Sequence, residues 1–306
     1  MMTRRLFLAG MALRRRGDAR AGMERVMGAM PRVAGVPRVE VMGETRDGEV
    51  ARKKIRYEAE AGDWVPAWLL EPARKNGRAA ICLHQTTRIG KDEPAGLGGL
   101  VNLHYARELA ARGFVTLAPD YPNFGEYKID VYARGYASAT MKGIVNHRRG
   151  VALLESLPGV TRGSAAAIGH SLGGHNALFL AAFEERVKAV VTSCGFTSFA
   201  KYSGGNLKGW SHKGYMPRIE SEYGCDPRRM PFDFPDVLAL IAPRPLFINA
   251  PLRDANFEVT GVDDCVEAVK ALYRTPGTLV AEHPNCAHDF PPAVRERAYR
   301  FLEQLK

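Results

Sequence analysis

One stretch near the middle of the chain constrains its fold more than any other part of the sequence. Residues 168–176 read Ile-Gly-His-Ser-Leu-Gly-Gly-His-Asn and contain a G-x-S-x-G pattern centred on Ser171. This pattern is typical of a sharp turn between a strand and a helix, which holds the serine hydroxyl clear of the backbone. Glycines flank the turn because side chains there would keep the strand and the helix apart. An apolar run of strand length, 164–168, precedes the turn and a helical pattern, 176–183, follows it, so the sequence predicts a strand–turn–helix unit.

A reactive serine needs two partners further along the chain. A histidine must accept the proton of the hydroxyl, and a carboxylate must fix the tautomer of that histidine. When the serine lies on a strand–helix turn, the acid follows it in the sequence and the histidine comes last. Asp254 follows the predicted strand 245–250, and His288 follows the predicted strand 277–283. We therefore predict that Ser171, Asp254 and His288 form a catalytic triad.

Other residues could in principle fill two of these roles. Glu258 is the alternative acid, whereas Asp263 and Asp264 fit better as charges near the beginning of a helix, where they complement its dipole. His283 is the nearest alternative base, but it ends a predicted strand directly before a proline, which indicates a structural role.

Attack of a serine on a carbonyl group produces a negatively charged oxygen, which two backbone N–H groups stabilise. One belongs to the residue after the nucleophile, Leu172, and the other lies in the loop after the third strand of the sheet. The apolar run 79–83 has the composition of that strand, and Gln85 and Thr86 lie in the loop that follows. We predict the amide of Gln85 as the second donor, with that of Thr86 as the alternative.

Two segments are expected to shape a pocket beside the serine. The connection after the predicted strand 188–194 is rich in aromatic residues and glycines, and we expect an insertion at about 200–227. Ligands bind at the carboxyl edge of a parallel sheet, where this insertion and the turn 120–125 would lie. Alternatively, the aromatic residues only anchor the connection to the core. The expected pocket residues are His84, Thr86, Tyr121, His170, Trp210 and Tyr215.

Length and composition favour one large domain. A chain of 306 residues with 46% hydrophobic residues can bury a full core, and we expect a single catalytic domain over 31–306. Short apolar runs alternate with longer helical patterns, which indicates the α/β class: a mostly parallel, twisted sheet of about eight strands with helices on both faces. Strands are expected near 50–60, 65–72, 79–84, 114–119, 164–170, 188–194, 245–250 and 277–283. Helices are expected near 97–112, 138–156, 173–184, 261–273 and 291–305.

Half of the formal net charge of +10 lies in residues 1–30, which form a basic leader. The remaining charge is ordinary for a soluble domain, so we expect no nucleic-acid partner.

Thr3-Arg4-Arg5-Leu6-Phe7-Leu8 resembles a twin-arginine export signal, and Ala19-Arg20-Ala21 has the form of a cleavage site. The uncharged stretch ends early, at Leu13, so a cytoplasmic protein is favoured and export is the alternative. No apolar run is long enough to span a bilayer, and no pattern indicates an oligomeric state.

The cysteines do not form a metal-binding pattern. The chain has five, without a C-x-x-C or a His/Cys cluster, and Cys82 and Cys194 lie on predicted core strands, where a thiol packs as a small apolar group. We expect neither a metal nor another cofactor.

From residue 50 to 305 the chain resembles serine esterases of the α/β-hydrolase superfamily, near the dienelactone-hydrolase-like and acetyl-xylan-esterase-like branches. The resemblance rests on 169–174, on Leu83-His84-Gln85 with 90–93, on Ile241-Ala-Pro-Arg-Pro245 and on Ala287-His288-Asp289-Phe290. It implies the α/β-hydrolase fold and cofactor-free hydrolysis of small-molecule carboxylic esters through an acyl-enzyme intermediate. Dienelactone hydrolases proper have a cysteine at the elbow, whereas this chain has Ser171. A prolyl-oligopeptidase architecture is disfavoured because its propeller has no room ahead of the first core strand.

Bulky residues such as Trp210 in the insertion would close the acyl pocket, so short-acyl esters, acetylated sugars among them, are the expected substrates. A serine peptidase or an acyltransferase of the same fold is the alternative, and a non-catalytic binding protein of this fold is a further one.

Overall fold

The core of the protein is one sheet of nine strands. The computed structural model describes residues 14–304. The strands are β1 (Val39–Asp47), β2 (Val50–Glu60), β3 (Asp63–Pro72), β4 (Gly77–Leu83), β5 (Val115–Pro119), β6 (Val160–His170), β7 (Ala189–Ser193), β8 (Leu246–Asn249) and β9 (Leu279–Glu282). The α/β class predicted from the sequence is confirmed, with one more strand than expected.

The strand order is β1-β2-β3-β5-β4-β6-β7-β8-β9. The strands from β5 to β9 in this order pair in parallel, whereas β1, β2, β3 and β5 pair antiparallel. In the parallel part, all carboxyl ends therefore lie along the same edge of the sheet. The loops that carry the predicted site residues leave the sheet at this edge.

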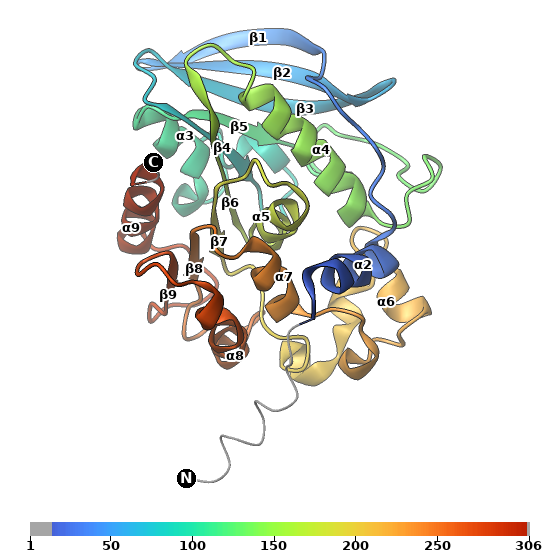
Figure 1. The fold of residues 1–306 in the computed structure, drawn as a ribbon. Coiled ribbons are helices and arrows are strands. Elements are labelled where there is room, and N and C mark those ends of the chain that lie inside the picture. Colours follow the sequence, from blue (N-terminus) through green and yellow to red (C-terminus); the bar gives the residue numbers. More distant parts are fainter. Residues whose placement is uncertain (1–13, 305–306) are drawn as a thin grey trace.

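Helices cover both faces of the sheet (Figure 1). They are α2 (Arg16–Met27), α3 (Tyr105–Ala111), α4 (Ala139–Leu154), α5 (Leu172–Phe183), α6 (Arg218–Ser221), α7 (Phe234–Ile241), α8 (Val259–Val269) and α9 (Pro292–Glu303). Successive side chains of a strand point to opposite faces. Accordingly Ile81 of β4 packs in a core cluster with α4, α5 and α7, while its neighbours Ala80 and Cys82 pack in a second cluster with α3 and α9.

Several elements differ from the sequence prediction. β1 was not expected, because its mostly exposed residues show no apolar alternation. The helix expected over 97–112 is shorter: α3 begins at Tyr105, after a segment in which Gly96, Gly98 and Gly99 have φ values of 76°, 135° and 73°. Such left-handed backbone interrupts a helix. The unexpected helix α7 begins at a capping box formed by Asp233 and Asp236.

Residues 16–27, in the second half of the predicted leader, form a helix that packs into the hydrophobic core. The twin-arginine motif lies outside the described residues, but α2 contains the cleavage-site pattern 19–21. Met23, Val26 and Met27 of this helix are completely buried in the main core cluster, and α2 packs against α7 (Figure 1). Cleavage at that pattern would therefore divide a helix that belongs to the fold.

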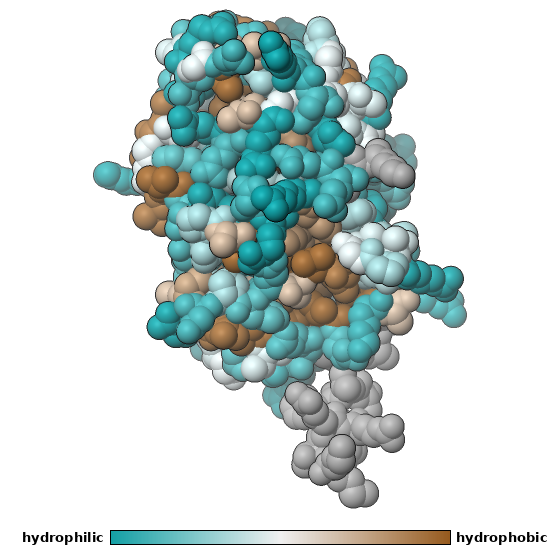
Figure 2. Space-filling model, turned by 90° about the vertical axis from the view of Figure 1, so that its left-hand side faces the viewer, coloured by the Kyte–Doolittle hydropathy of each residue, from teal (hydrophilic) through white to brown (hydrophobic). Residues whose placement is uncertain are grey.

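The surface is mostly hydrophilic on the side of α3 and α9, with apolar residues exposed in separate patches (Figure 2). Within residues 14–304, no helix is both long and apolar enough to cross a membrane.

Candidate active site

Ser171 lies between β6 and α5, at the turn that the G-x-S-x-G pattern predicts. Its backbone angles, φ 52° and ψ −117°, lie outside the regions that side chains favour. A Cβ atom at Gly169 would collide with the carbonyl of Gly173, and one at Gly173 would collide with the carbonyl of Leu83. Only glycines allow this close approach of strand and helix, and the strained turn presents the hydroxyl at the carboxyl edge of the sheet.

The structure brings Asp254 and His288 together. Nδ1 of His288 lies 2.9 Å from both carboxylate oxygens of Asp254. Burial alone would raise the pKa of Asp254, but hydrogen bonds from His288 and from the amides of Asn256 and Phe257 outweigh it and lower the pKa. The carboxylate is therefore held in its charged form, which can fix the tautomer and the orientation of the imidazole.

The alternative acid and base lie in other contacts. Glu258 precedes α8 and its carboxylate accepts a hydrogen bond from the hydroxyl of Thr260. Nδ1 of His283 lies 2.8 Å from the carbonyl of Ala250, and its Nε2 lies 3.1 Å from Asp263. These contacts support the structural role that the sequence indicated for His283.

Ser171 and His288 line one cavity of about 410 Å³ at the sheet edge. Nε2 of His288 is buried and has no hydrogen-bond partner among the described residues. The hydrogen bond from the serine to the base is thus not formed in this state. In free enzymes such bonds are often long or poorly aligned, and they tighten when substrate binds.

The predicted oxyanion donors lie on two elements beside this cavity. Leu172 is the first residue of α5, so its N–H has no partner within the helix. Gln85 follows β4 and lines the cavity, and its side-chain amide donates to the buried carboxylate of Glu93 at 3.0 Å. This contact braces the connection between β4 and α3 internally, because Glu93 lies in the same connection as Gln85.

The cavity wall contains some of the expected neighbours of Ser171 and not others. Its lining residues are Gln85, Thr86, Ser171, Leu172, His175, Tyr202, Gly209, Trp210, His212, Tyr215, Asn256, Phe257 and His288. Thr86, Trp210 and Tyr215 thus lie where the sequence placed them. Asn256 and Phe257 were missed, although their position just after Asp254 is a signal that could have found them.

Three side chains that we expected in the pocket lie behind its wall instead. Nε2 of His84 accepts a hydrogen bond from the amide of Tyr121 at 2.9 Å, and its Nδ1 lies 2.6 Å from the carbonyl of Gln85. The hydroxyl of Tyr121 donates to the carbonyl of Gly214 at 3.1 Å. His170 is 1% exposed, and its Nδ1 faces the hydroxyl of Ser193 at the end of β7. These polar atoms are used to connect loops, so the rings are not available to a ligand.

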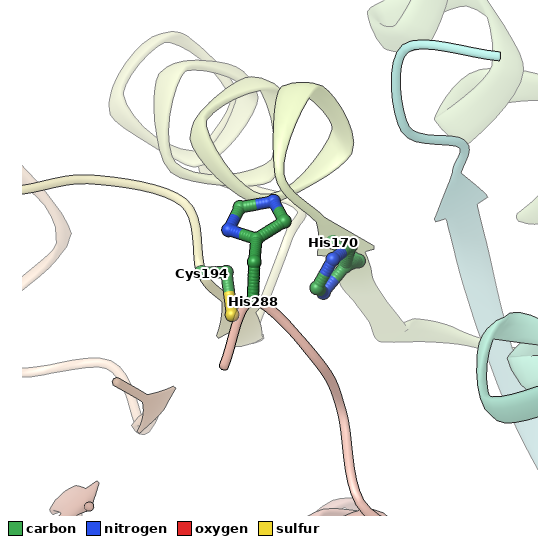
Figure 3. Close-up of side chains that lie close together, drawn as sticks. All are labelled: His170, Cys194 and His288. Atoms are coloured by element: carbon green, nitrogen blue, oxygen red, sulfur yellow. The ribbon is translucent and has the colours of Figure 1, made fainter. Parts of the chain in front are cut away.

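His170, Cys194 and His288 form a compact group whose nitrogen and sulfur atoms lie within 4.8 Å of one another. Such donors suit zinc. However, Figure 3 shows His170 and Cys194 on either side of the His288 ring, and Nδ1 of His288 faces Asp254. Burial, and then the carboxylate of Asp254, raise the pKa of the Cys194 thiol. Nδ1 of His288 is thus already in contact with a carboxylate, and the expectation of a metal-free site stays a prediction.

Comparison with known proteins places this geometry in a wider context. The model described as "Alpha/beta hydrolase family" matches residues 95–302, a range that contains Ser171, Asp254 and His288. A curated protein of Bacillus subtilis (strain 168), named "Putative hydrolase YtaP", is 21% identical over 94% of this chain and 99% of its own length.

Solved structures show the same architecture. The glucuronoyl esterase from Solibacter usitatus superposes with a TM-score of 0.75 at 16% identity, over 95% of this chain and 92% of that one. Acetyl xylan esterase 1 from Thermoanaerobacterium sp. JW/SL YS485 gives a TM-score of 0.64 at 17% identity, over 93% and 92% of the two chains. At these identities the likeness shows the fold alone.

Proposed function

Because the chain belongs to the alpha/beta hydrolase family, we propose that it is a serine carboxylic-ester hydrolase that acts through Ser171, His288 and Asp254. The observation that carries this proposal is the contact of His288 Nδ1 with both oxygens of Asp254, at 2.9 Å, beside the strained turn that holds Ser171. The three residue types have the roles that nucleophilic catalysis requires: nucleophile, base and orienting acid.

In this mechanism the Ser171 oxygen attacks the ester carbonyl carbon while Nε2 of His288 takes the hydroxyl proton. The amides of Leu172 and Gln85 stabilise the resulting oxyanion. When the tetrahedral intermediate collapses, the carbon–oxygen bond to the alcohol breaks and His288 returns the proton to the leaving oxygen. A water molecule, deprotonated by His288, then attacks the acyl-enzyme, which releases the acid and restores the serine. No step requires a cofactor.

The lining of the cavity favours ester substrates with a small acyl group and a polar alcohol. Trp210 closes one side and packs edge-on against His175, with ring centroids 4.7 Å apart. Hydroxyl, imidazole and amide groups of Thr86, Tyr215, His212 and Asn256 share the lining with aromatic rings. Such a mixture of aromatic faces and polar groups suits sugar-linked acyl esters. The name of one structurally similar protein, an acetyl xylan esterase, supports a small acyl group on a sugar; that of another, a glucuronoyl esterase, supports sugar-linked esters only in general, because its acyl group is a sugar acid.

The test is labelling and hydrolysis with one variant. A fluorophosphonate probe should label the unmodified protein, because labelling requires an activated serine, and should not label Ser171→Ala. The same variant should lose about 10⁴- to 10⁶-fold in kcat on nitrophenyl acetate while it keeps its fold, since the lost hydroxyl is small and packs little. If the folded variant kept more than a few per cent of the activity, Ser171 would not be the nucleophile. A panel of acetylated sugars and nitrophenyl esters then identifies the substrate.

A further inference from the structure

Three polar side chains stand in a row at the ends of three neighbouring strands. His170 ends β6, Ser193 ends β7 and Asn249 ends β8, and the sheet register pairs His170 with Ser193 and Ser193 with Asn249. All three are at most 1% exposed. Burial of polar side chains is unfavourable unless they form hydrogen bonds. We call these three residues the strand-end network.

Hydrogen bonds connect the network from strand to strand. Nδ1 of His170 lies 2.9 Å from the hydroxyl of Ser193, and Nδ2 of Asn249 donates to the same hydroxyl at 2.8 Å. Nδ2 of Asn249 also donates to the main-chain carbonyl of Asp289 at 2.9 Å. The opposite orientation of the amide would place its oxygen against that carbonyl, so the donor role of Nδ2 follows from its neighbours.

The carbonyl at the end of this row belongs to the residue directly after His288. The thiol of Cys194 also lies 3.4 Å from it, and Asn102 donates to both carboxylate oxygens of Asp289, at 2.9 and 3.1 Å. The main chain beside His288 is thus held from the strand ends on one side and from the 3₁₀ turn Val101–Leu103 on the other.

The network also contacts the other catalytic residues. Its His170 meets the ring of His288 edge to face, with centroids 4.8 Å apart and planes at 64° (Figure 3). The carbonyl of Ser193 accepts a hydrogen bond from the amide of Ser171 at 2.8 Å. One set of buried residues therefore touches both the nucleophile's backbone and the base.

We propose that His170, Ser193 and Asn249 are positioning residues that set the distance and angle between His288 and Ser171. This inference rests on the proposed function. None of the three lines the cavity, so they act on the reaction only through the residues they hold. A displacement of about 1 Å at a catalytic group can reduce the rate by about 10²-fold, and loss of the Asn249 hydrogen bond would free the His288 loop to move by such an amount.

The test compares Asn249→Leu and Ser193→Ala with the unmodified enzyme on nitrophenyl acetate. Asn249→Leu keeps the branched side-chain shape but has no group that can donate to Ser193 or to the Asp289 carbonyl. We expect kcat to fall by about 10²-fold with little change in KM, because the pocket itself is unchanged. Ser193→Thr, which keeps the hydroxyl, should recover much of the kcat that Ser193→Ala loses. The double variant Asn249→Leu/Ser193→Ala should be hardly worse than the worse of its two single variants, since the two residues act as one unit.

Thr116→Val is the matched control. Its hydroxyl is completely buried on β5 and donates to the carbonyl of Ala106 at 3.0 Å, away from His288. It should lose thermal stability but keep kcat. An unchanged kcat in folded Asn249→Leu and Ser193→Ala, or an equal fall in Thr116→Val, would overturn the proposal. If instead the unmodified protein shows no Ser171-dependent hydrolysis or labelling, the proposed function itself has failed, which is a separate result.

Discussion

At the scale of single residues, the role of the Asp254 carboxylate beside His288 can be tested most directly. We expect Asp254→Asn to reduce kcat by up to about 10⁴-fold, because the amide keeps the geometry but favours the wrong tautomer of His288. Glu258→Gln is the matched control, since Glu258 contacts Thr260 instead, and it should keep nearly full activity. Steady-state kinetics on nitrophenyl acetate measures both. A nearly silent Asp254→Asn beside a severe Glu258→Gln would assign the acid to Glu258.

The sequence predicted the positions of Ser171, Asp254 and His288 because each follows a predicted strand, and parallel strands bring such residues to one edge. It could not predict side-chain directions. His84 and Tyr121 were placed at the correct edge, but the bond from the Tyr121 amide orients the His84 ring away from the cavity, and the bond from the Tyr121 hydroxyl to the Gly214 carbonyl does the same for the Tyr121 ring. Ser193 and Asn249 were not predicted as functional residues, because a polar residue at a strand end has no distinctive sequence pattern. Only the register of β7 and β8 shows that the two lie side by side.

At the scale of elements, the insertion at 200–227 should limit acyl length. We expect acetyl and propionyl esters to give higher kcat/KM than octanoyl esters, since each methylene that remains unburied forgoes about 0.8 kcal/mol of transfer free energy. Trp210→Ala should narrow this gap by opening the wall that its ring forms. Kinetics on a nitrophenyl ester series checks the expectation.

The control must match the loss of stability that Trp210→Ala brings. Removal of a buried aromatic side chain costs about 3–5 kcal/mol. Phe232→Ala removes a ring that is completely buried beside Phe199 but does not line the cavity. It should leave the acyl preference unchanged. Better turnover of octanoyl than of acetyl esters by the unmodified enzyme would show that the insertion leaves the pocket open.

Substitutions in helix α2 test the interpretation of residues 1–30 as a leader. A Cβ atom at Gly22 would collide with the main-chain carbonyl of Pro231, whereas one at Gly17 of the same helix would meet nothing within 4 Å. Gly22→Ala should therefore lower the free energy of unfolding by about 1–3 kcal/mol, while Gly17→Ala should leave it equal or slightly higher. Thermal unfolding of the full chain compares the two.

A chain that begins at Gly22, as cleavage after the pattern 19–21 would leave it, should also unfold at a lower temperature. It would lose the buried Ala19 and the hydrogen bond from Arg20 to the carbonyl of Ala182, at 2.9 Å. Equal melting temperatures of the full and shortened chains would favour the cleaved leader.

The elements that differ from the prediction have separate physical causes. Apolar periodicity identifies a helix or strand best when one face is apolar and the other polar, and a short apolar run does not separate a buried strand from a buried helix. β1 is an edge strand with little buried surface, and α7 is a run of only eight residues, all of them buried, too short to be assigned as a helix from its pattern. The shortened α3 follows from the glycines before it, whose left-handed conformation a helical apolar pattern cannot exclude.

At the scale of the whole molecule, several histidines are buried without charge. Burial lowers the pKa of His147, His170 and His175 to about 3, and it also lowers that of His84 despite the nearby Asp120. In the unfolded chain these groups titrate near pH 6.5. Asp233 works in the opposite direction, because burial raises its pKa to about 7 and the folded state then holds a proton that the unfolded state has lost.

The protein should therefore be sensitive to acid. As the pH falls from about 6.5 toward 3, the unfolded state binds protons that the folded histidines do not accept, so each lowers the free energy of unfolding by up to about 1.4 kcal/mol per pH unit. Asp233 offsets roughly one of the three histidines whose pKa is about 3, which leaves a slope of up to about 3 kcal/mol per pH unit, and His84 adds to it in the same direction. Urea unfolding between pH 7 and pH 5 measures this slope. His147→Leu removes one titrating group outside the proposed site. In this variant the free energy of unfolding should change less steeply with pH, by up to about 1.4 kcal/mol per pH unit. The same slope in both proteins, or a stability that does not change between pH 7 and pH 5, would show that these histidines accept protons in the folded state.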